Sequence, residues 1–243
     1  MTVVEICVGD VPSALAAEAA GADRLELCAD LGQGGTTPSI GMVAVALRTL
    51  RRAALKVMVR PRGGDFVVSE TEQQVMLADI AAIRALPNPH GLALGIVAGA
   101  LTADGDLDRA LLRKVVDAAG PLPVTVHKAF DEVPDQLTAL DHVIELGAGA
   151  VLTSGGAASA RKGAARIAAL GERAAGRLRI IAAGGIRSHN VAEILAATHA
   201  TEIHLRAPIE LQGREATDPA EVRRVLAAVS RVSPGPECGR SPA

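Results

Sequence analysis

The stretch PVTVHKAFDEVPDQLTALDHVIELGAGAVLT, residues 123–153, contains two strand patterns with a helix pattern between them. PVTVHK (123–128) and AVLT (150–153) are short and rich in β-branched residues, whereas LTALDHVIEL (137–146) spaces its apolar residues at the helical period. A helix that connects two neighbouring strands allows them to run parallel in one sheet. The stretch therefore predicts a β/α unit whose first strand ends directly in the charged or polar residues His127, Lys128 and Asp131.

Similar strand patterns recur along the chain at a spacing that fits a closed barrel. Eight are found: VVEICV (3–8), RLELC (24–28), LKVMVR (55–60), LALGIV (92–97), PVTVHK (123–128), AVLT (150–153), RIIAA (179–183) and EIHL (202–205). Helical patterns lie between them at 13–20, 71–86, 108–119, 137–146, 165–170 and 190–198. Eight such units in 243 residues are typical of an α/β protein with a (β/α)₈ or TIM barrel. A doubly wound open sheet is the competing architecture, but it is disfavoured because no GxGxxG motif follows an early strand.

The predicted barrel occupies residues 1–232 as a single domain, with no linker inside it. Residues 233–243, SPGPECGRSPA, are rich in Pro, Gly and Ser, so we expect a disordered tail there.

Composition narrows the classes of function. The net charge is −2, 49% of the residues are hydrophobic, and neither Trp nor Tyr is present. We therefore expect no nucleic-acid partner, because a basic surface and aromatic stacking residues are lacking. No run of about 18 apolar residues and no signal-peptide pattern is found, so no membrane association is expected and a cytoplasmic location is predicted. The three cysteines form no CxxC pair, which fits a reducing compartment.

Several polar residues fall on the strand face that is expected to point into the barrel. Side chains alternate along a strand, so Glu5 shares a face with Cys7, and Glu26 shares a face with Cys28. A carboxylate is costly to desolvate on the outer face beneath the helices, which favours the interior. By the same parity, the interior also receives Arg60 with Met58 and Lys56, His127 with Thr125, and Glu202 with His204 and Arg206. This set is either an ion-pair network that fixes strand register or a site at the carboxyl ends of the strands.

Four loops that follow strands combine glycine with polar residues. They are LGQGGTTPS (31–39), RPRGGDF (60–66), TSGG (153–156) and AGGI (183–186). Glycine lets backbone N–H groups approach an anion, and late loops of barrels often bind phosphate. The two aromatic residues, Phe66 and Phe130, also fall in loops, where they either line a pocket or pack the loop onto the rim.

The motifs ELC with GGTTPS, VMVRPRGGDF, HKAFD, LTSGG, GGI and EIH together resemble the CutC family over about residues 1–210. The resemblance implies a TIM barrel, a cytoplasmic homo-oligomer and a role in copper homeostasis. The positions that match the family pattern, and that would line its pocket, are Glu5, Cys7, Glu26, Cys28, Arg60, Arg62, Asp65, Phe66, His127, Phe130, Asp131, Ser154, Gly155, Gly156, Gly185, Asn190 and His204. Lys128, Ala183 and Arg206 depart from it, and Arg206 places a large cation where the family has a small hydroxyl.

The first functional hypothesis is binding of copper, as Cu(I), with Cys7 and Cys28 as the metal ligands. Soft thiolate and thioether ligands select Cu(I), and Met58 lies on the next strand. The competing interpretation is that both cysteines are small buried apolar residues, which is common for free cysteine. Copper is the only cofactor that these residues suggest.

The alternative is an enzyme of the lyase, isomerase or hydrolase type that acts on a small anionic or phosphorylated substrate at the barrel mouth. In that case His127 is the general acid or base, oriented by Asp131 or a Glu, and Glu26 is a carboxylate base. Arg60 and Arg62 bind the anion, and the TSGG and AGGI loops hold its phosphate. The ligand-binding residues of this site are Glu5, Arg62, Asp65, Ser154, Gly155, Gly156, Gly184, Gly185 and His204. Whether the protein is an enzyme is left open at this point.

Overall fold

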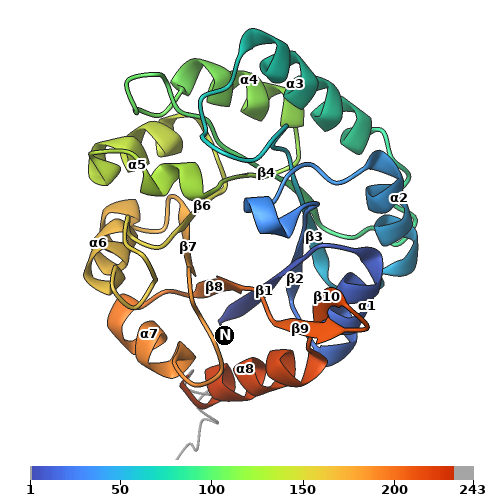
Figure 1. Ribbon diagram of the computed structural model, residues 1–243. Coiled ribbons are helices and arrows are strands. Elements are labelled where there is room, and N and C mark those ends of the chain that lie inside the picture. The colour runs from blue at the N-terminus through green and yellow to red at the C-terminus, as the bar shows by residue number, and fades with distance from the viewer. Residues whose placement is uncertain (1, 233–243) are drawn as a thin grey trace, which may run out of the picture.

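The computed structural model describes residues 2–232 and contains a closed barrel of eight parallel strands surrounded by helices (Figure 1). The strands are β1 (Val3–Val8), β2 (Arg24–Leu27), β3 (Ala54–Met58), β4 (Leu94–Ala98), β5 (Val124–Val126), β6 (Ala150–Thr153), β7 (Arg179–Ala183) and β8 (Glu202–Leu205). The barrel closes where β1 pairs with β8, with Val3 opposite Glu202 and Glu5 opposite His204. The predicted (β/α)₈ barrel is confirmed.

The surrounding helices follow the strands in order. They are α1 (Val11–Ala20), α2 (Ile40–Thr49), α3 (Glu70–Arg84), α4 (Arg109–Ala119), α5 (Gln136–Glu145), α6 (Ala164–Ala174), α7 (Val191–Thr198) and α8 (Pro219–Val232), with short 3₁₀ turns η1 (Leu31–Gln33) and η2 (Lys128–Asp131). Local caps explain several boundaries. Asp10 accepts a hydrogen bond from the amide of Ser13 at the start of α1, and Ser69 and Glu72 form a capping box at the start of α3. None of the helices within residues 2–232 has both the length and the apolar character that a membrane span requires.

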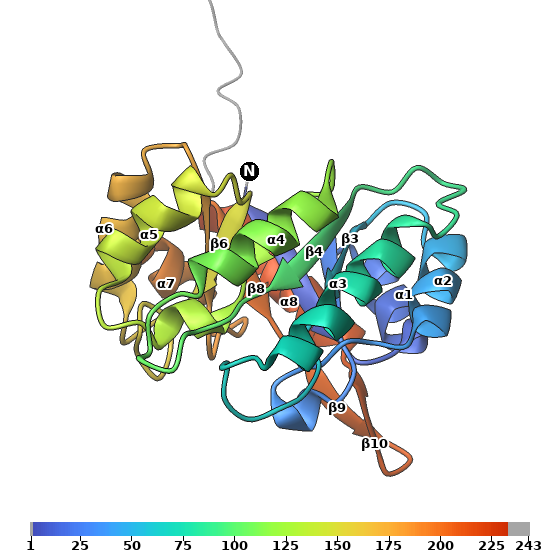
Figure 2. The same ribbon diagram turned by 90° about the horizontal axis from the view of Figure 1, so that it is seen from above.

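The sequence patterns missed two helices and a hairpin. The segment of α2, IGMVAVALRT, is almost wholly apolar and contains Gly and Val, so it shows little helical periodicity. Strands β9 (Pro208–Leu211) and β10 (Arg214–Thr217) form an antiparallel hairpin that projects from one end of the barrel (Figure 2). Its turn residues Gln212 and Gly213 both have positive φ, which is the conformation of a two-residue hairpin turn. The predicted tail, 233–243, lies outside the described residues.

The apolar core lies mainly between the barrel and its helices. Outward-facing strand residues such as Ile6, Leu25 and Val57 are fully buried there against helix residues such as Leu47. Within residues 2–232, two small apolar clusters lie inside the barrel. One holds Cys7, Cys28, Met58 and Val97, and the other holds Ala150, Leu152, Ile181 and Ala183.

The remaining interior is polar, as the strand parity predicted. Near the amino ends of the strands, Arg24 donates to Glu5 and, over 2.6 Å, to Glu202. The Lys56 ammonium donates to Thr125 over 2.6 Å and lies 3.5 Å from Glu5. Because every member of this group is buried and paired, it is an ion-pair network that joins β1, β2, β3 and β8. The two interpretations of the polar interior therefore apply to two different layers of the barrel. The ion-pair network lies near the amino ends of the strands, and a cavity lies toward their carboxyl ends.

Candidate functional site

A cavity of about 560 Å³ opens at the carboxyl ends of the strands, where active sites of barrels lie. Its inner end is formed by Cys7, Glu26, Met58 and His204. Its outer walls are the predicted glycine loops and their neighbours: Leu31, Gln33, Gly34, Arg60, Gly64, Phe66, His127, Lys128, Asp131, Glu132, Leu152, Ser154, Gly156, Ala157, Ala183, Gly184, Gly185, Arg187, Leu205 and Arg206. Most of the predicted site residues are thus brought together in one place.

The two cysteines form a pair at the inner end. Cys7, on β1, lines the cavity, and Cys28 lies directly behind it with its Sγ 3.9 Å from the Sγ of Cys7. Cys28 also lies 3.5 Å from a carboxyl oxygen of Glu26. The hydrogen bond with Cys28 lowers the pKa of Cys7 to about 5, against the effect of burial, and His204 adds to this. The same hydrogen bond, together with burial, raises the pKa of Cys28 well above its usual value. Both shifts favour the thiolate form at Cys7 over Cys28.

His204 connects this thiolate to two carboxyl groups. Its Nδ1 lies 2.7 Å from Glu5, and its Nε2 lies 3.8 Å from Glu26. Burial alone would lower the pKa of His204, but Glu26, Cys7 and Glu5 raise it well above the usual value. The pKa of Glu26 is raised to about 8 by burial. The pKa of Glu5 is lowered, because Lys56, His204 and Arg24 outweigh the effect of burial.

Three of these residues are arranged as a metal-ligand group. Ligand atoms of Cys7, Glu26 and His204 all lie within 4.8 Å of one another. The two Sγ atoms are also close enough to share an ion, since two metal–thiolate bonds of about 2.3 Å, the length seen for zinc, span at most about 4.6 Å. The thioether of Met58 packs in the same cluster. The inner end thus offers sulfur ligands, an imidazole and a carboxylate within one small volume.

Arg60 lies at the cavity wall, but its guanidinium is bound to the protein itself. Its Nη1 donates to the carbonyls of Gln33 and Gly35, and its Nη2 donates to the carbonyl of Gly64. It also stacks over the ring of Phe66, 4.6 Å from the ring centroid. Arg60 therefore joins two mouth loops, and its charge has no carboxylate partner within salt-bridge distance among the described residues. Arg60 was expected to clamp an anion. Since its Nη atoms already donate to backbone carbonyls, only its unpaired positive charge is left for that role.

His127 lines the cavity as predicted, but it is not oriented by Asp131. Its Nδ1 accepts a hydrogen bond from the amide of Ala129, 3.2 Å away, so the ring proton is placed on Nε2. The ring packs on Phe66, with centroids 5.0 Å apart. Burial and the nearby Arg60 charge lower the pKa of His127 to about 3, so the imidazole is neutral.

Asp131 belongs instead to the TSGG loop. Its carboxylate accepts hydrogen bonds from the hydroxyls of Thr153 and Ser154 and from the amides of Ser154 and Gly156. The amide of Gly155 donates to Thr153. The loop that was expected to hold a phosphate therefore holds a carboxylate of the protein, which is a correction to the predicted roles of Asp131, Ser154, Gly155 and Gly156.

Arg62 and Asp65 lie outside the cavity, contrary to the expectation that they bind the ligand. Arg62 is exposed and pairs with Asp65 and Glu72, over 3.0 and 2.6 Å, on the outer side of the rim. Of the two aromatic residues, Phe66 lines the cavity and Phe130 is fully buried in the core beneath the loop. The expectation of a pocket wall is correct for Phe66 and wrong for Phe130.

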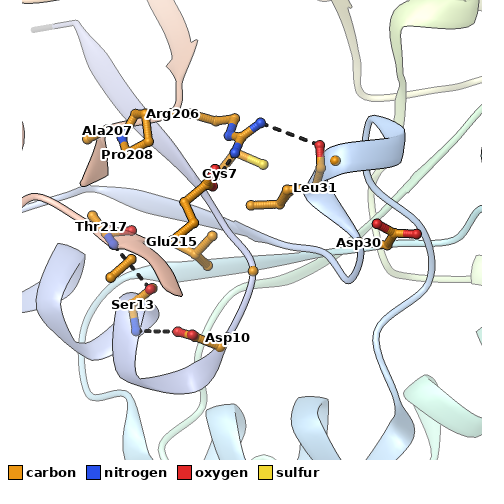
Figure 3. Close-up of a pocket in the computed structure, with 14 residues that line it drawn as sticks. Cys7, Asp10, Ser13, Asp30, Leu31, Arg206, Ala207, Pro208, Glu215 and Thr217 are labelled. Carbon is orange, nitrogen blue, oxygen red and sulfur yellow. Dashed lines mark hydrogen bonds and ion pairs between the residues drawn. The ribbon is translucent and has the colours of Figure 1, made fainter. Parts of the chain in front are cut away.

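A second cavity of about 230 Å³ lies on the other side of Cys7, between the start of α1, η1 and the β9–β10 hairpin. Cys7, Leu31 and Arg206 line both cavities and therefore separate them. Figure 3 shows Arg206 beside Cys7, with its guanidinium directed to the carbonyl of Leu31 and to Glu215. Arg206, which departs from the family pattern, thus ties the hairpin to the barrel.

Sequence reasoning missed three residues that line a cavity or form ion pairs near one. Arg24 shares strand parity with Glu26, so its place in the interior was available from the same argument. Glu215 belongs to the hairpin, whose only signal was the turn Gln212–Gly213. Arg187 follows the AGGI loop, and nothing in the sequence indicated that its side chain reaches the cavity.

The fold and the site define the class: a (β/α)₈ barrel with a sulfur- and carboxyl-lined cavity at its carboxyl-terminal mouth. The model of the CutC family matches residues 2–209, so this chain belongs to the CutC family. A family protein CutC of Parabacteroides distasonis is 45% identical over 205 residues, covering 84% of this chain and 82% of that protein. The copper homeostasis protein cutC homolog of Homo sapiens is 46% identical over 204 residues, covering 84% of this chain and 72% of that protein.

Solved structures agree on the fold. A crystal structure of CutC from Streptococcus agalactiae superposes with a TM-score of 0.77 at 30% identity, covering 84% of this chain and 98% of that chain. Phosphoribosylanthranilate isomerase of Thermotoga maritima has a TM-score of 0.60 at 13% identity, covering 95% of this chain and 100% of that chain. At that identity, the second likeness concerns the barrel fold alone.

Proposed function

We propose that the protein binds Cu(I) through Cys7 and Cys28 and acts through this binding in copper homeostasis. The single observation that carries the proposal is the thiol pair, with Sγ atoms 3.9 Å apart at the inner end of the cavity. Copper homeostasis is also the description of the human relative.

The chemistry of the pair suits a soft monovalent ion. One thiol is held as a thiolate by its neighbour, and Met58 supplies a thioether in the same cluster. Soft sulfur ligands select Cu(I) over harder cations. The ion is the cargo of this site, and Glu26 and His204 are close enough to complete its surroundings.

The test is an anaerobic titration of Cu(I) in competition with a chromophoric chelator. The wild-type protein is expected to bind one equivalent tightly, and Cys7→Ser/Cys28→Ser is expected to lose this binding. Cys238→Ser removes the remaining thiol of the chain and serves as the matched control, with binding unchanged. Failure of the wild type to compete, or equal binding by the double variant, would contradict the proposal.

Cytoplasmic action and homo-oligomer formation are parts of the same proposal and rest on the family resemblance. Sedimentation velocity of the purified protein tests the second part. A mass of one chain, 24.8 kDa, across micromolar concentrations would contradict it.

A further inference from the structure

The AGGI loop, residues 183–186, lies beside the TSGG loop at the cavity wall, and only one of the two loops has an acceptor for its glycine amides. In the TSGG loop, Asp131 accepts from Ser154 and Gly156. In the AGGI loop, the amides of Gly184 and Gly185 donate to none of the residues in 2–232. Gly184 is half-buried and Gly185 is exposed, and both line the cavity, so their amides are free to donate to a ligand there.

The direction of one open donor follows from the carbonyl of the same peptide unit. The carbonyl of Gly184 accepts from the amide of Ala160 over 2.9 Å. In a planar trans peptide the N–H points opposite to the carbonyl, so the Gly185 amide faces away from Ala160. Ala160 does not line the cavity, whereas Gly184 and Gly185 both do.

The loop conformation is specific to glycine. Gly184 and Gly185 have φ of 104° and 70°, values that residues with a side chain rarely adopt. A Cβ on Gly184 would also lie 3.1 Å from the Cβ of Ser154. Glycine at both positions lets the backbone approach a ligand closely.

Cations also line this cavity. Lys128 lies with its Nζ 3.9 Å from Asp131, whose carboxylate accepts from the hydroxyl of Ser154, the neighbour of Gly184. Arg187 lines the cavity and forms no ion pair with a described carboxylate. Arg60 lies across the barrel from this loop, after β3, and has no described carboxylate partner. The carboxylates at this mouth are Asp131, which is held by the neighbouring loop, and Glu132.

We propose that the AGGI loop, with Lys128 and Arg187, binds the phosphate group of a small organic phosphate in the outer half of the cavity. Amide pairs and two cations match a dianion better than a neutral ligand. The volume of about 560 Å³ accommodates the organic part of such a molecule. This site is separate from the sulfur ligands and does not depend on bound copper.

The test is a titration of copper-free protein at pH 7.5 with glycerol 3-phosphate, inorganic phosphate and acetate. Binding is measured by calorimetry and by the chemical shifts of the amide signals. Glycerol 3-phosphate is expected to bind more tightly than inorganic phosphate, acetate is expected not to bind, and the amide signals of Gly184 and Gly185 are expected to move. Arg187→Gln and Lys128→Gln should each weaken binding about tenfold, the effect of losing one charge-assisted hydrogen bond. Arg62→Gln, at the same rim but paired outward, is the matched control with unchanged affinity.

Several results would overturn the proposal. They are no binding of glycerol 3-phosphate at 10 millimolar, equal binding of acetate, binding that Arg187→Gln and Lys128→Gln leave unchanged, or unmoved Gly184 and Gly185 signals. The titration is repeated on Cys7→Ser/Cys28→Ser, where equal affinity is expected. Loss of phosphate binding in that variant would show that the anion binds at the inner end of the cavity. That result would also overturn the proposal. Because copper is absent throughout, failure here leaves the copper proposal unaffected.

Discussion

At the scale of the residue, His127 shows how burial decides the chemistry of a side chain. The residue is 4% exposed, and its ring packs on Phe66 and lies near the charge of Arg60. These surroundings lower its pKa to about 3, from a usual value near 6.5. At neutral pH it is therefore a neutral hydrogen-bonding group, and it is unsuited to act as a cationic acid.

A dependence of stability on pH follows from this shift. Between pH 6.5 and 3 the unfolded chain binds a proton at His127 that the folded protein does not bind. The neutral His127 imidazole therefore contributes fully to the free energy of unfolding above pH 6.5. This contribution is lost as the pH falls below that value. We expect wild type to lose up to about 2–3 kcal/mol more than His127→Asn between pH 6.5 and 4.5, measured by urea denaturation. Parallel curves for the two proteins would contradict the neutral buried imidazole.

The predictive power of the sequence at this scale came from strand parity. Alternation placed Glu5, Cys7, Glu26, His127 and His204 in the interior, and the structure agrees. It failed for Asp131 and Arg62, because these residues lie in loops, where no fixed period relates position to direction. Hydrogen bonds with the neighbouring loop or with the outer rim decide where such side chains point.

At the scale of the element, the TSGG loop is built around a carboxylate from the preceding unit. Asp131 accepts from four donors of Thr153, Ser154 and Gly156. Asp131→Ala leaves these donors without an acceptor, so we expect the free energy of unfolding to fall by about 2–4 kcal/mol. Chemical denaturation measures this, and hydrogen exchange of residues 153–156 should accelerate.

Asp135→Ala is the comparison for that substitution. Asp135 is an exposed cap at the start of α5, so its removal is expected to cost only about 1 kcal/mol. An equal loss for both variants would show that Asp131 is merely another cap.

The β9–β10 hairpin is tied to the barrel by the pair of Arg206 and Glu215. The pair is partly exposed, so Arg206→Ser is expected to change stability by less than about 1 kcal/mol. It should nevertheless speed the reaction of Cys7 with a thiol reagent several-fold, because Arg206 lies beside Cys7 where the two cavities meet and the smaller Ser leaves the reagent more room. The rates are compared in a Cys238→Ser background, with Arg224→Gln as the control on α8. Unchanged reactivity would show that Leu31 alone covers Cys7.

The missed helix α2 and the missed hairpin share a cause. Helix α2 is apolar on nearly all sides, and β9 and β10 are short and exposed, so neither shows a clear hydrophobic period. Helix α8 is different, because Asp218 followed by Pro219 is a recognisable start pattern for a helix.

At the scale of the whole molecule, the buried ion-pair network closes the barrel. Glu5 on β1 contacts Arg24 on β2, Lys56 on β3 and His204 on β8, so it spans the seam where the first and last strands meet. Glu5→Gln leaves these cations without a buried carboxylate, and we expect a loss of about 3–5 kcal/mol. Urea denaturation monitored by circular dichroism checks this. A loss below about 1 kcal/mol, as for an exposed pair, would show that the seam does not depend on Glu5.

The barrel itself was predictable from the sequence because its signal is repeated. Eight strand patterns support one another, and eight β/α units at this length are typical of a closed barrel. The site was predictable only in part, since its inner end lies on strands but its outer walls lie on loops.

Cys7 faces a cavity on each of two sides, with Leu31 and Arg206 between them. The Cys7 sulfur is therefore open to approach along two separate routes. A molecule that occupies one cavity leaves the other free for a second molecule to reach the same atom.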